Sequence, residues 1–443
     1  MPVMLISKIL KATRANNDWS EILKKSGLNL SFRLLGKLAA YLLVFLIIKL
    51  HGPENFGKWT LSLTIFLMLE MVSNLGLKTA MVRTFSSESK EGNAFRLKAV
   101  YTKAFLLLTV SSLVFGLSLY LLAEAVGTAY NKNYLGEILQ LLSFGFLPFN
   151  IIDLNSGVLR GLRKIGTHSF LENLGNPLFS VIFIGCGFLI NDSFQEVFLW
   201  YLLALSALAL ISIFLVYKQL KGTANTGHSS SYSEILSVSI PMFFTTSMNV
   251  LDRWADILVL GFFCSEVQIA AYGLANRLSK MIIIPLQSVN SISASKFRKL
   301  YIQRDIKGLE RITKSSTRLI ALSSILPLLF LVLSASFVIS IFNTELLIGI
   351  VALQILALSQ LANIFTGSVG QLLNMTEGHK TLMQIAIVST IINIVLNLIF
   401  IPNYGIEGAA LATFCSLAFN NLFSAWVLKR RFGFSPAYIP FFK

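Results

Sequence analysis

The residues most able to do chemistry in this sequence are charged side chains that fall inside long apolar segments. Five of them are cations: Arg33, Lys37, Arg253, Arg277 and Lys280. A charge near the centre of a bilayer costs several kcal/mol unless it is paired or hydrated. Cations inside apolar segments therefore indicate a functional site, and five of them together indicate an anionic cargo.

Arg277 and Lys280 are the strongest candidates for binding an anion. At 1.5 Å per helical residue they lie roughly 15 to 20 Å into their segment, too deep to reach the headgroups easily. Their i, i+3 spacing places them on one helical face, where Arg offers two parallel N–H donors and Lys a point charge. An internal ion pair with Asp252 or Asp256 is the alternative.

Arg33 and Lys37 are spaced i, i+4 and also share a helical face. They lie within two turns of the start of the first apolar segment. Either they face water inside the protein and bind the anion first, or they snorkel to the headgroups. The sequence leaves both possibilities open.

Acidic residues in the apolar segments are candidates for ion coupling. Asp252, Arg253 and Asp256 lie together in one segment, at spacings that allow them to pair with one another. The alternative is that Asp252 or Asp256 binds or exchanges a coupling Na⁺ or H⁺. Asp153 and Glu70 are further candidates for the same role.

The elements that must position these residues are membrane-spanning helices. Hydrophobic residues make up 55% of the 443 residues and charged residues 13%, and the mean hydropathy is +0.71. Because hydrocarbon satisfies no backbone polar group, long apolar stretches in such a chain are expected to be helices. We predict an all-α integral membrane protein with twelve spans, at 29–49, 57–77, 101–123, 138–159, 171–190, 195–217, 234–262, 267–290, 317–341, 346–372, 381–401 and 405–428.

Basic residues fall on alternate sides of these spans. Segments on one side carry 29 of the 37 Lys and Arg residues, whereas the other side has only Lys49, Lys58 and Lys132. Cytoplasmic loops retain Lys and Arg during insertion, so both termini are predicted to be cytoplasmic. The asymmetry also accounts for most of the net charge of +16, so no nucleic-acid partner is needed to explain it.

Cysteine and histidine give no cofactor or metal signature. Cys186, Cys264 and Cys415 are isolated, and the four histidines lie far apart along the chain. We therefore predict no metal site and no cofactor other than a possible coupling Na⁺ or H⁺.

The chain reads as two related halves. A shift of 213 residues aligns Trp59 with Tyr272 and Gly157 with Gly370, among other pairs. Six spans per half is an even number, so the pseudo-twofold axis would run along the membrane normal. The predicted parts are an amphipathic cytoplasmic segment, an N-lobe, a polar linker, a C-lobe and a cytoplasmic tail, at 1–28, 29–217, 218–233, 234–428 and 429–443.

Several short motifs resemble one family of transporters. They are Gly52 to Trp59, Gly76-Leu77 with Arg83, Arg160 to Lys164, Asp256 to Gly261 and Ala271 to Ala275. Together they resemble the polysaccharide-unit flippases, the Wzx-type O-antigen and capsule exporters. These belong to the MOP superfamily with the MATE drug exporters and the lipid II flippases. Ala270-Ala271-Tyr272 departs from the family pattern, which usually has Gly before the Tyr.

This resemblance implies a fold and a cargo. The fold would be two six-helix lobes around a central cavity that opens alternately to each side. The cargo would be an oligosaccharide linked to undecaprenyl pyrophosphate, whose anionic diphosphate Arg277, Lys280, Arg33, Lys37 and Arg253 would bind. The protein would be a monomer in the bacterial inner membrane, in contact with membrane lipids and with polysaccharide polymerase or ligase proteins.

Other functions fit the sequence less well. A membrane enzyme needs a catalytic platform, whereas the external loops predicted here run to only about 15 residues with few ionisable groups. A MATE-type drug antiporter, the main alternative, would prefer an acidic cavity for cationic drugs. A lipid II flippase, the second alternative, usually has two further spans that this sequence lacks. We therefore expect a transporter and not an enzyme.

Overall fold

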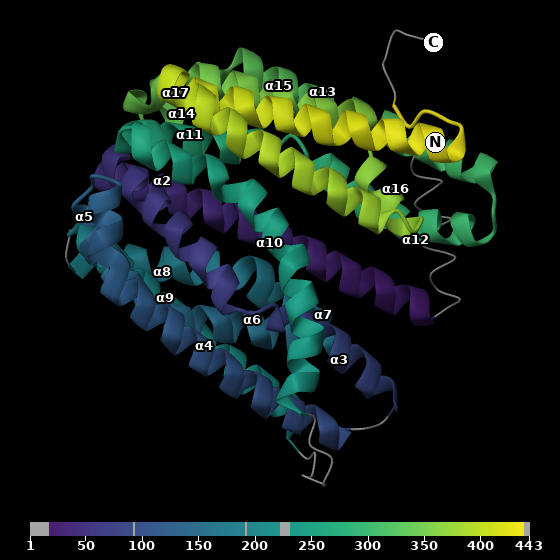
Figure 1. Ribbon diagram of the computed structural model, residues 1–443, viewed down its shortest axis with the longest axis horizontal. Helices are drawn as coiled ribbons and strands as arrows, with labels where there is room; N and C mark the ends of the chain where they lie inside the picture. Colours follow the sequence, from purple (N-terminus) through teal and green to yellow (C-terminus); the bar gives the residue numbers. More distant parts are fainter. Residues whose placement is uncertain (1–16, 92–93, 191–192, 222–230, 438–443) are drawn as a thin grey trace. The chain divides into compact units, whose positions relative to one another are not determined.

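The computed structural model describes residues 17–91, 94–190, 193–221 and 231–437, and all regular elements in these ranges are helices (Figure 1). Side chains are described in the same ranges except at 17–26, 88–91, 94–96 and 244–253. Seven helical segments are long and apolar enough to cross a bilayer, or eight if the bent pair of α5 and α6 counts as one span. The prediction of an all-α membrane protein is confirmed in this coarse form.

The first half of the described chain runs from α2 to α9. Its elements are α2 Asn17–Ser73, α3 Leu77–Glu91, α4 Ala94–Ala129, α5 Tyr134–Ser143, α6 Phe146–Gly161, α7 Ile165–Ser169, the π-helix η1 Phe170–Gly175, α8 Asn176–Ile190 and α9 Phe194–Leu220.

The second half runs from α10 to α17. Its elements are α10 Tyr232–Phe263, α11 Glu266–Ser279, α12 Ile284–Ile302, α13 Ile306–Leu333, α14 Ala335–Phe342, the 3₁₀-helix η2 Thr344–Gly349, α15 Ile350–Thr366, α16 Val369–Met375 and α17 His379–Phe432.

Several predicted spans are joined or interrupted in the structure. Helices α2 and α17 each contain one residue with non-helical backbone, Gly52 at φ 86° and Gly405 at φ 56°, conformations that glycine tolerates without strain. Helices α2 and α17 therefore each contain two predicted spans. The predicted spans 138–159, 267–290 and 346–372 are interrupted at residues 144–145, 280–283 and 367–368. The number of twelve spans stays a prediction.

Exposed apolar side chains mark the surface that lipid covers. On α4, Leu113, Leu117 and Leu121 are 59%, 61% and 69% exposed, and their i, i+4 spacing makes a continuous apolar stripe. A contiguous apolar face of this kind marks an interaction surface, and on a helix this apolar the partner is hydrocarbon.

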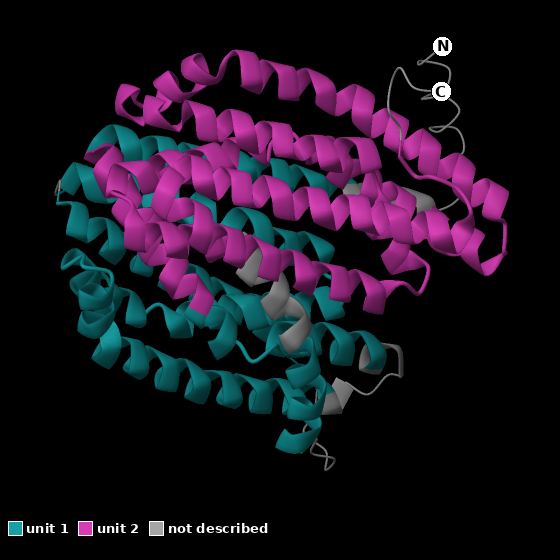
Figure 2. Ribbon diagram, turned by 45° about the horizontal axis from the view of Figure 1, so that its top comes forward, with its two compact units in different colours: residues 1–50, 69–244 teal, residues 51–68, 245–443 magenta. Residues whose placement is uncertain are grey.

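The chain divides into two compact units, which Figure 2 colours separately. Unit 1 comprises residues 1–50 and 69–244, and unit 2 comprises residues 51–68 and 245–443. In unit 1, α6 packs against α3, α4 and α9. In unit 2, α17 packs against α15 and α16. The lobes and linker predicted from the sequence are defined by spans and stay a prediction, and residues 222–230 of the linker lie outside the described residues.

Candidate functional site

Asp256 is the centre of a buried polar cluster in unit 2. Its side chain, on α10, is only 3% exposed. Its Oδ1 accepts a hydrogen bond from Nδ2 of Asn397 at 2.6 Å. Its Oδ2 accepts from the hydroxyls of Tyr272 at 2.5 Å and Thr413 at 2.8 Å. Three neutral donors therefore solvate this carboxylate in place of water, as a buried charge requires.

Helical spacing and helix capping position two of these donors, Asn397 and Tyr272. Asn393 and Asn397 lie one turn apart on α17, and Asn397 also donates to Oδ1 of Asn393 at 3.1 Å. Tyr272 lies on α11, whose start is fixed by a capping box between Ser265 and Gln268. Oδ1 of Asn397 is buried and has no hydrogen-bond partner in the described part of the chain. Several oxygens thus gather around one carboxylate, an arrangement that could bind a small cation or a proton.

Arg277 and Lys280 lie where the predicted span 267–290 is interrupted. Arg277 is in the last turn of α11, Lys280 is its C-terminal capping residue, and α12 begins only at Ile284 with Pro285 in its first turn. Non-helical backbone at membrane depth is tolerated where it is buried in protein or lines a water-filled space. Lys280 is exposed and Arg277 partly buried, so both side chains reach the surface of unit 2.

Phe56 supports the guanidinium of Arg277. The ring of Phe56 is fully buried, and the guanidinium carbon lies 5.6 Å from its centroid. The adjacent Gly57 brings the backbone close, because a Cβ there would lie 1.9 Å from the carbonyl oxygen of Glu266, at the start of α11. This packing holds the guanidinium of Arg277 by a cation–π contact with the Phe56 ring.

Arg33 and Lys37 lie on either side of Gly36 in unit 1, and both are partly exposed. A Cβ on Gly36 would lie 2.0 Å from the carbonyl oxygen of Asn173 in η1. Two turns before Gly36, Asn29 accepts a hydrogen bond from the hydroxyl of Ser169. The helix face that carries Gly36 therefore packs on η1, and Arg33 and Lys37 lie at the edge of this contact.

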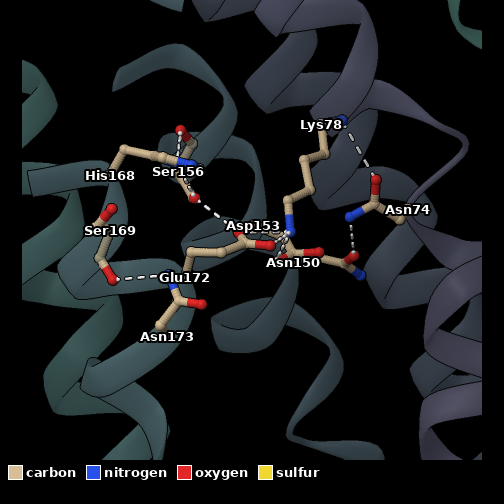
Figure 3. A network of polar contacts seen from close by, with 9 residues as sticks. All are labelled: Asn74, Lys78, Asn150, Asp153, Ser156, His168, Ser169, Glu172 and Asn173. Atoms are coloured by element: carbon tan, nitrogen blue, oxygen red, sulfur yellow. Dashed lines mark hydrogen bonds and ion pairs between the residues drawn. The ribbon is translucent and has the colours of Figure 1, made fainter. Parts of the chain in front are cut away.

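A second charged cluster, shown in Figure 3, joins four elements of unit 1, α3, α6, α7 and η1. The ammonium of Lys78 on α3 lies 3.0 Å from Oδ1 of Asp153 on α6 and 2.8 Å from Oε2 of Glu172 in η1. The hydroxyl of Ser156 donates to Oε2 of Glu172 at 3.0 Å and lies 2.9 Å from Nδ1 of His168. We call these five residues the Lys78 cluster.

The structure places the predicted site residues in separate groups. Asp256 and Arg277 belong to unit 2, whereas Arg33, Lys37, Asp153 and Glu70 belong to unit 1. The side chains of Asp252 and Arg253 lie outside the described residues.

Sequence reasoning missed several polar partners. The pair Asn393 and Asn397 could have been found, because two amides one turn apart in an apolar span need partners. Lys78 and Glu172 gave a weaker signal, since both lie near the ends of predicted spans, where charge is common.

The sequence matches two protein families. Residues 22–297 match the family described as Polysaccharide biosynthesis protein, and residues 241–399 match the family MatE. One relative is the probable low-salt glycan biosynthesis flippase Agl15 of Haloferax volcanii, which is 23% identical over 85% of this chain and 77% of its own length.

Two solved structures have the same fold. A multidrug resistance MATE family transporter of the MOP superfamily, in an inward-facing conformation, aligns over 92% of this chain and 98% of its own with a TM-score of 0.76 and 15% identity. The lipid II flippase MurJ, in an inward closed conformation, aligns over 92% of this chain and 87% of its own with a TM-score of 0.73 and 17% identity. The predicted resemblance is confirmed: with more than half of its length matched, the chain belongs to the polysaccharide biosynthesis protein family, and its fold is that of MOP-superfamily transporters.

Proposed function

We propose that this protein is a flippase that moves an oligosaccharide linked to undecaprenyl pyrophosphate from the inner to the outer leaflet of a bacterial cytoplasmic membrane. The observation that carries the proposal is the pair Arg277 and Lys280 at the interruption between α11 and α12. Two cations can bind a diphosphate through charge-assisted hydrogen bonds. A break in a membrane helix is tolerated beside a water-filled space, which such a polar group would also need. The family membership and the flippase named Agl15 support the same cargo class.

The proposed architecture is twelve spans in two six-helix lobes, with both termini in the cytoplasm. Gly52 and Gly405 support it, because each divides a long helix into two parts. The shortest part, residues 53–73, is about 30 Å long, enough to cross the hydrocarbon core. The distribution of Lys and Arg supports the orientation. A monomer would suffice, with polymerase or ligase proteins acting on its product.

The Asp256 cluster is the proposed site of ion coupling. The side chain of Asp256 accepts hydrogen bonds from three neutral donors, and a Na⁺ or H⁺ could bind it by displacing one of them. The unpartnered Oδ1 of Asn397 supplies a further ligand oxygen. Binding there would involve α10, α11 and α17 together, and so could change how these helices pack.

Complementation tests the cargo. Wild type, Arg277→Ala and Lys280→Ala would be expressed at matched levels in a bacterium lacking its own O-unit flippase, and surface polysaccharide would be measured on a gel. Lys314→Ala is the matched control, because Lys314 is exposed and pairs with Glu310 on the same helix surface. We expect rescue by the wild type and the control and loss of rescue in both Ala variants.

The other outcomes separate the alternatives. Rescue that survives both substitutions would remove the diphosphate site from Arg277 and Lys280. Failure of the wild type to rescue, with a gain of drug resistance, would instead favour a MATE-type exporter. The match of residues 241–399 to the MatE family supports this second candidate.

Ion binding is tested by thermal unfolding of the purified protein. Sodium chloride should raise the melting temperature above that in choline chloride, because a ligand that binds only the folded state stabilises it. Asp256→Asn should abolish the difference, whereas Glu310→Gln, which changes a partly exposed acid of the same unit, should retain it. If sodium has no effect, the same comparison made across pH tests for a proton.

A further inference from the structure

Glu70 of unit 1 is a buried acid that the proposed transport scheme does not use. It lies in the last turn of α2, just before the left-handed residues Leu75 and Gly76 that separate α2 from α3. Its side chain is only 7% exposed, and its Oε1 has no hydrogen-bond partner in the described part of the chain. Burial removes water from this carboxyl group, and only the side chain of Asn74 partly compensates an ionised form, so the arrangement favours the neutral acid.

The charges around Glu70 act in opposite directions. The carboxylate of Asp153 on α6 disfavours a negative charge on Glu70, whereas the ammonium of Lys78 on α3 favours one. Lys78 also pairs with Glu172 of η1. Lys78 thus pairs with two carboxylates and acts electrostatically on Glu70, so the group would carry an excess of negative charge if all three acids were ionised and no proton or cation joined them.

The occupant that fits this group is a proton and not a metal ion. The ammonium of Lys78 already lies between the carboxylates of Asp153 and Glu172, where a metal would have to bind. Among the described residues, no group of three or more His, Cys, Asp and Glu side chains is arranged to hold a metal. His168 is held at Nδ1 by both the hydroxyl and the carbonyl oxygen of Ser156. Arg160, also close to His168, disfavours a second positive charge there.

We propose that Glu70 binds an exchangeable proton, at a site in unit 1 distinct from the Asp256 cluster, and that this proton controls the ion pairs of Lys78. When Glu70 is neutral, Lys78 joins α3 to α6 and η1 through Asp153 and Glu172. When Glu70 loses its proton, its new charge competes for the same ammonium, and these connections weaken. The proton site does not depend on the cargo; its use in transport rests on the proposed flippase function.

The position of Glu172 explains how a proton could affect a larger element. Glu172 lies in η1, a π-helical turn, which is a rare conformation frequently found at functional sites. The same turn supports α2 at Gly36 through the carbonyl of Asn173. A change in the ion pair of Glu172 would therefore act on the packing of α2, which carries Arg33 and Lys37.

Infrared spectroscopy of the full chain in lipid nanodiscs tests the proton site directly. A step from about pH 6 to about pH 9 should remove a protonated-carboxyl band from the wild-type spectrum. Glu70→Gln should lack that band, and Glu124→Gln, which changes an exposed acid of the same unit, should keep it. An unchanged band in Glu70→Gln would overturn the proposal. Glu70→Asp retains a carboxyl and should show the band at a shifted frequency, which guards against loss through misfolding.

Two further variants test the link to Lys78. Asp153→Asn removes a neighbouring negative charge, so the band of Glu70 should titrate at lower pH. Lys78→Met removes the positive charge, so it should titrate at higher pH. Opposite shifts would support a shared network, and no shift in either variant would overturn the link. The readout does not use transport, so it would stand even if the cargo proposal failed.

Discussion

Lys78 connects three elements of unit 1 through one ammonium group. Replacing it by Met should leave Asp153 and Glu172 without their cation, which we expect to destabilise the protein by about 2 kcal/mol. This value is at the low end for a buried pair because the three side chains are 24–35% exposed. The measurement is the free energy of unfolding in mixed micelles.

A matched control and a double variant sharpen this test. Lys314→Met breaks a surface pair with Glu310 and should change the free energy of unfolding by less than about 1 kcal/mol. Lys78→Met combined with Glu172→Gln should cost less than the two single changes added together, because the pair is then removed as a unit. Strict additivity would show that the ion pair does not stabilise the fold.

At the residue scale, sequence reasoning identified charges but not their partners. The depth of Asp256 in an apolar span marked it as unusual. Its donors Tyr272, Asn397 and Thr413 come from two other helices, up to 157 positions away. Helical periodicity predicts which residues share a face of one helix, but it says nothing about which faces of different helices meet.

At the scale of elements, glycine sets where helices can approach. Gly36→Ala should weaken the packing of α2 on η1, because the new Cβ would lie 2.0 Å from the carbonyl oxygen of Asn173. The backbone at Asn173 cannot move without disturbing the adjacent Glu172 of the Lys78 cluster, so we expect a loss of about 3 kcal/mol. The melting temperature and the yield of monodisperse protein measure it.

Gly185→Ala is the control for this prediction. Gly185 is also helical, but nothing lies within 4 Å of an added Cβ. Alanine favours helix over glycine by up to about 1 kcal/mol, so the control should be neutral or slightly stabilising. An equal loss in both variants would indicate that helix propensity, and not the close approach, determines the result.

The breaks inside elements were the least predictable part of the fold. The apolar run 267–290 predicts one helix, yet α11 ends at Ser279 and α12 begins at Ile284. Hydropathy indicates only whether a segment is apolar enough for lipid. It does not predict a break, because the backbone polar groups freed there can be satisfied by residues distant in sequence. Asn150 and Asn155 in the predicted span 138–159 show such distant partners for side chains, since they donate to Ser112 of α4 and Ser212 of α9.

For the whole molecule, the predicted orientation can be tested by labelling. In a chain whose three cysteines are replaced by alanine, Asn133→Cys should react with a membrane-impermeant maleimide on intact cells, because it lies in a predicted external loop. Lys307→Cys should react only after the cells are opened. Both positions are exposed, so access to the reagent differs only through the membrane. The reverse pattern would invert the proposed topology.

The division into units has a consequence for gene fission. Residues 51–68 belong to unit 2 by their contacts, although they come before most of unit 1 along the chain. A gene split within codons 222–230 would therefore encode a second polypeptide that lacks a stretch of its own unit, including the fully buried Phe56. Neither product should accumulate when made alone. Their synthesis in the same cell should restore a functional pair. Selection would then maintain the two gene fragments together.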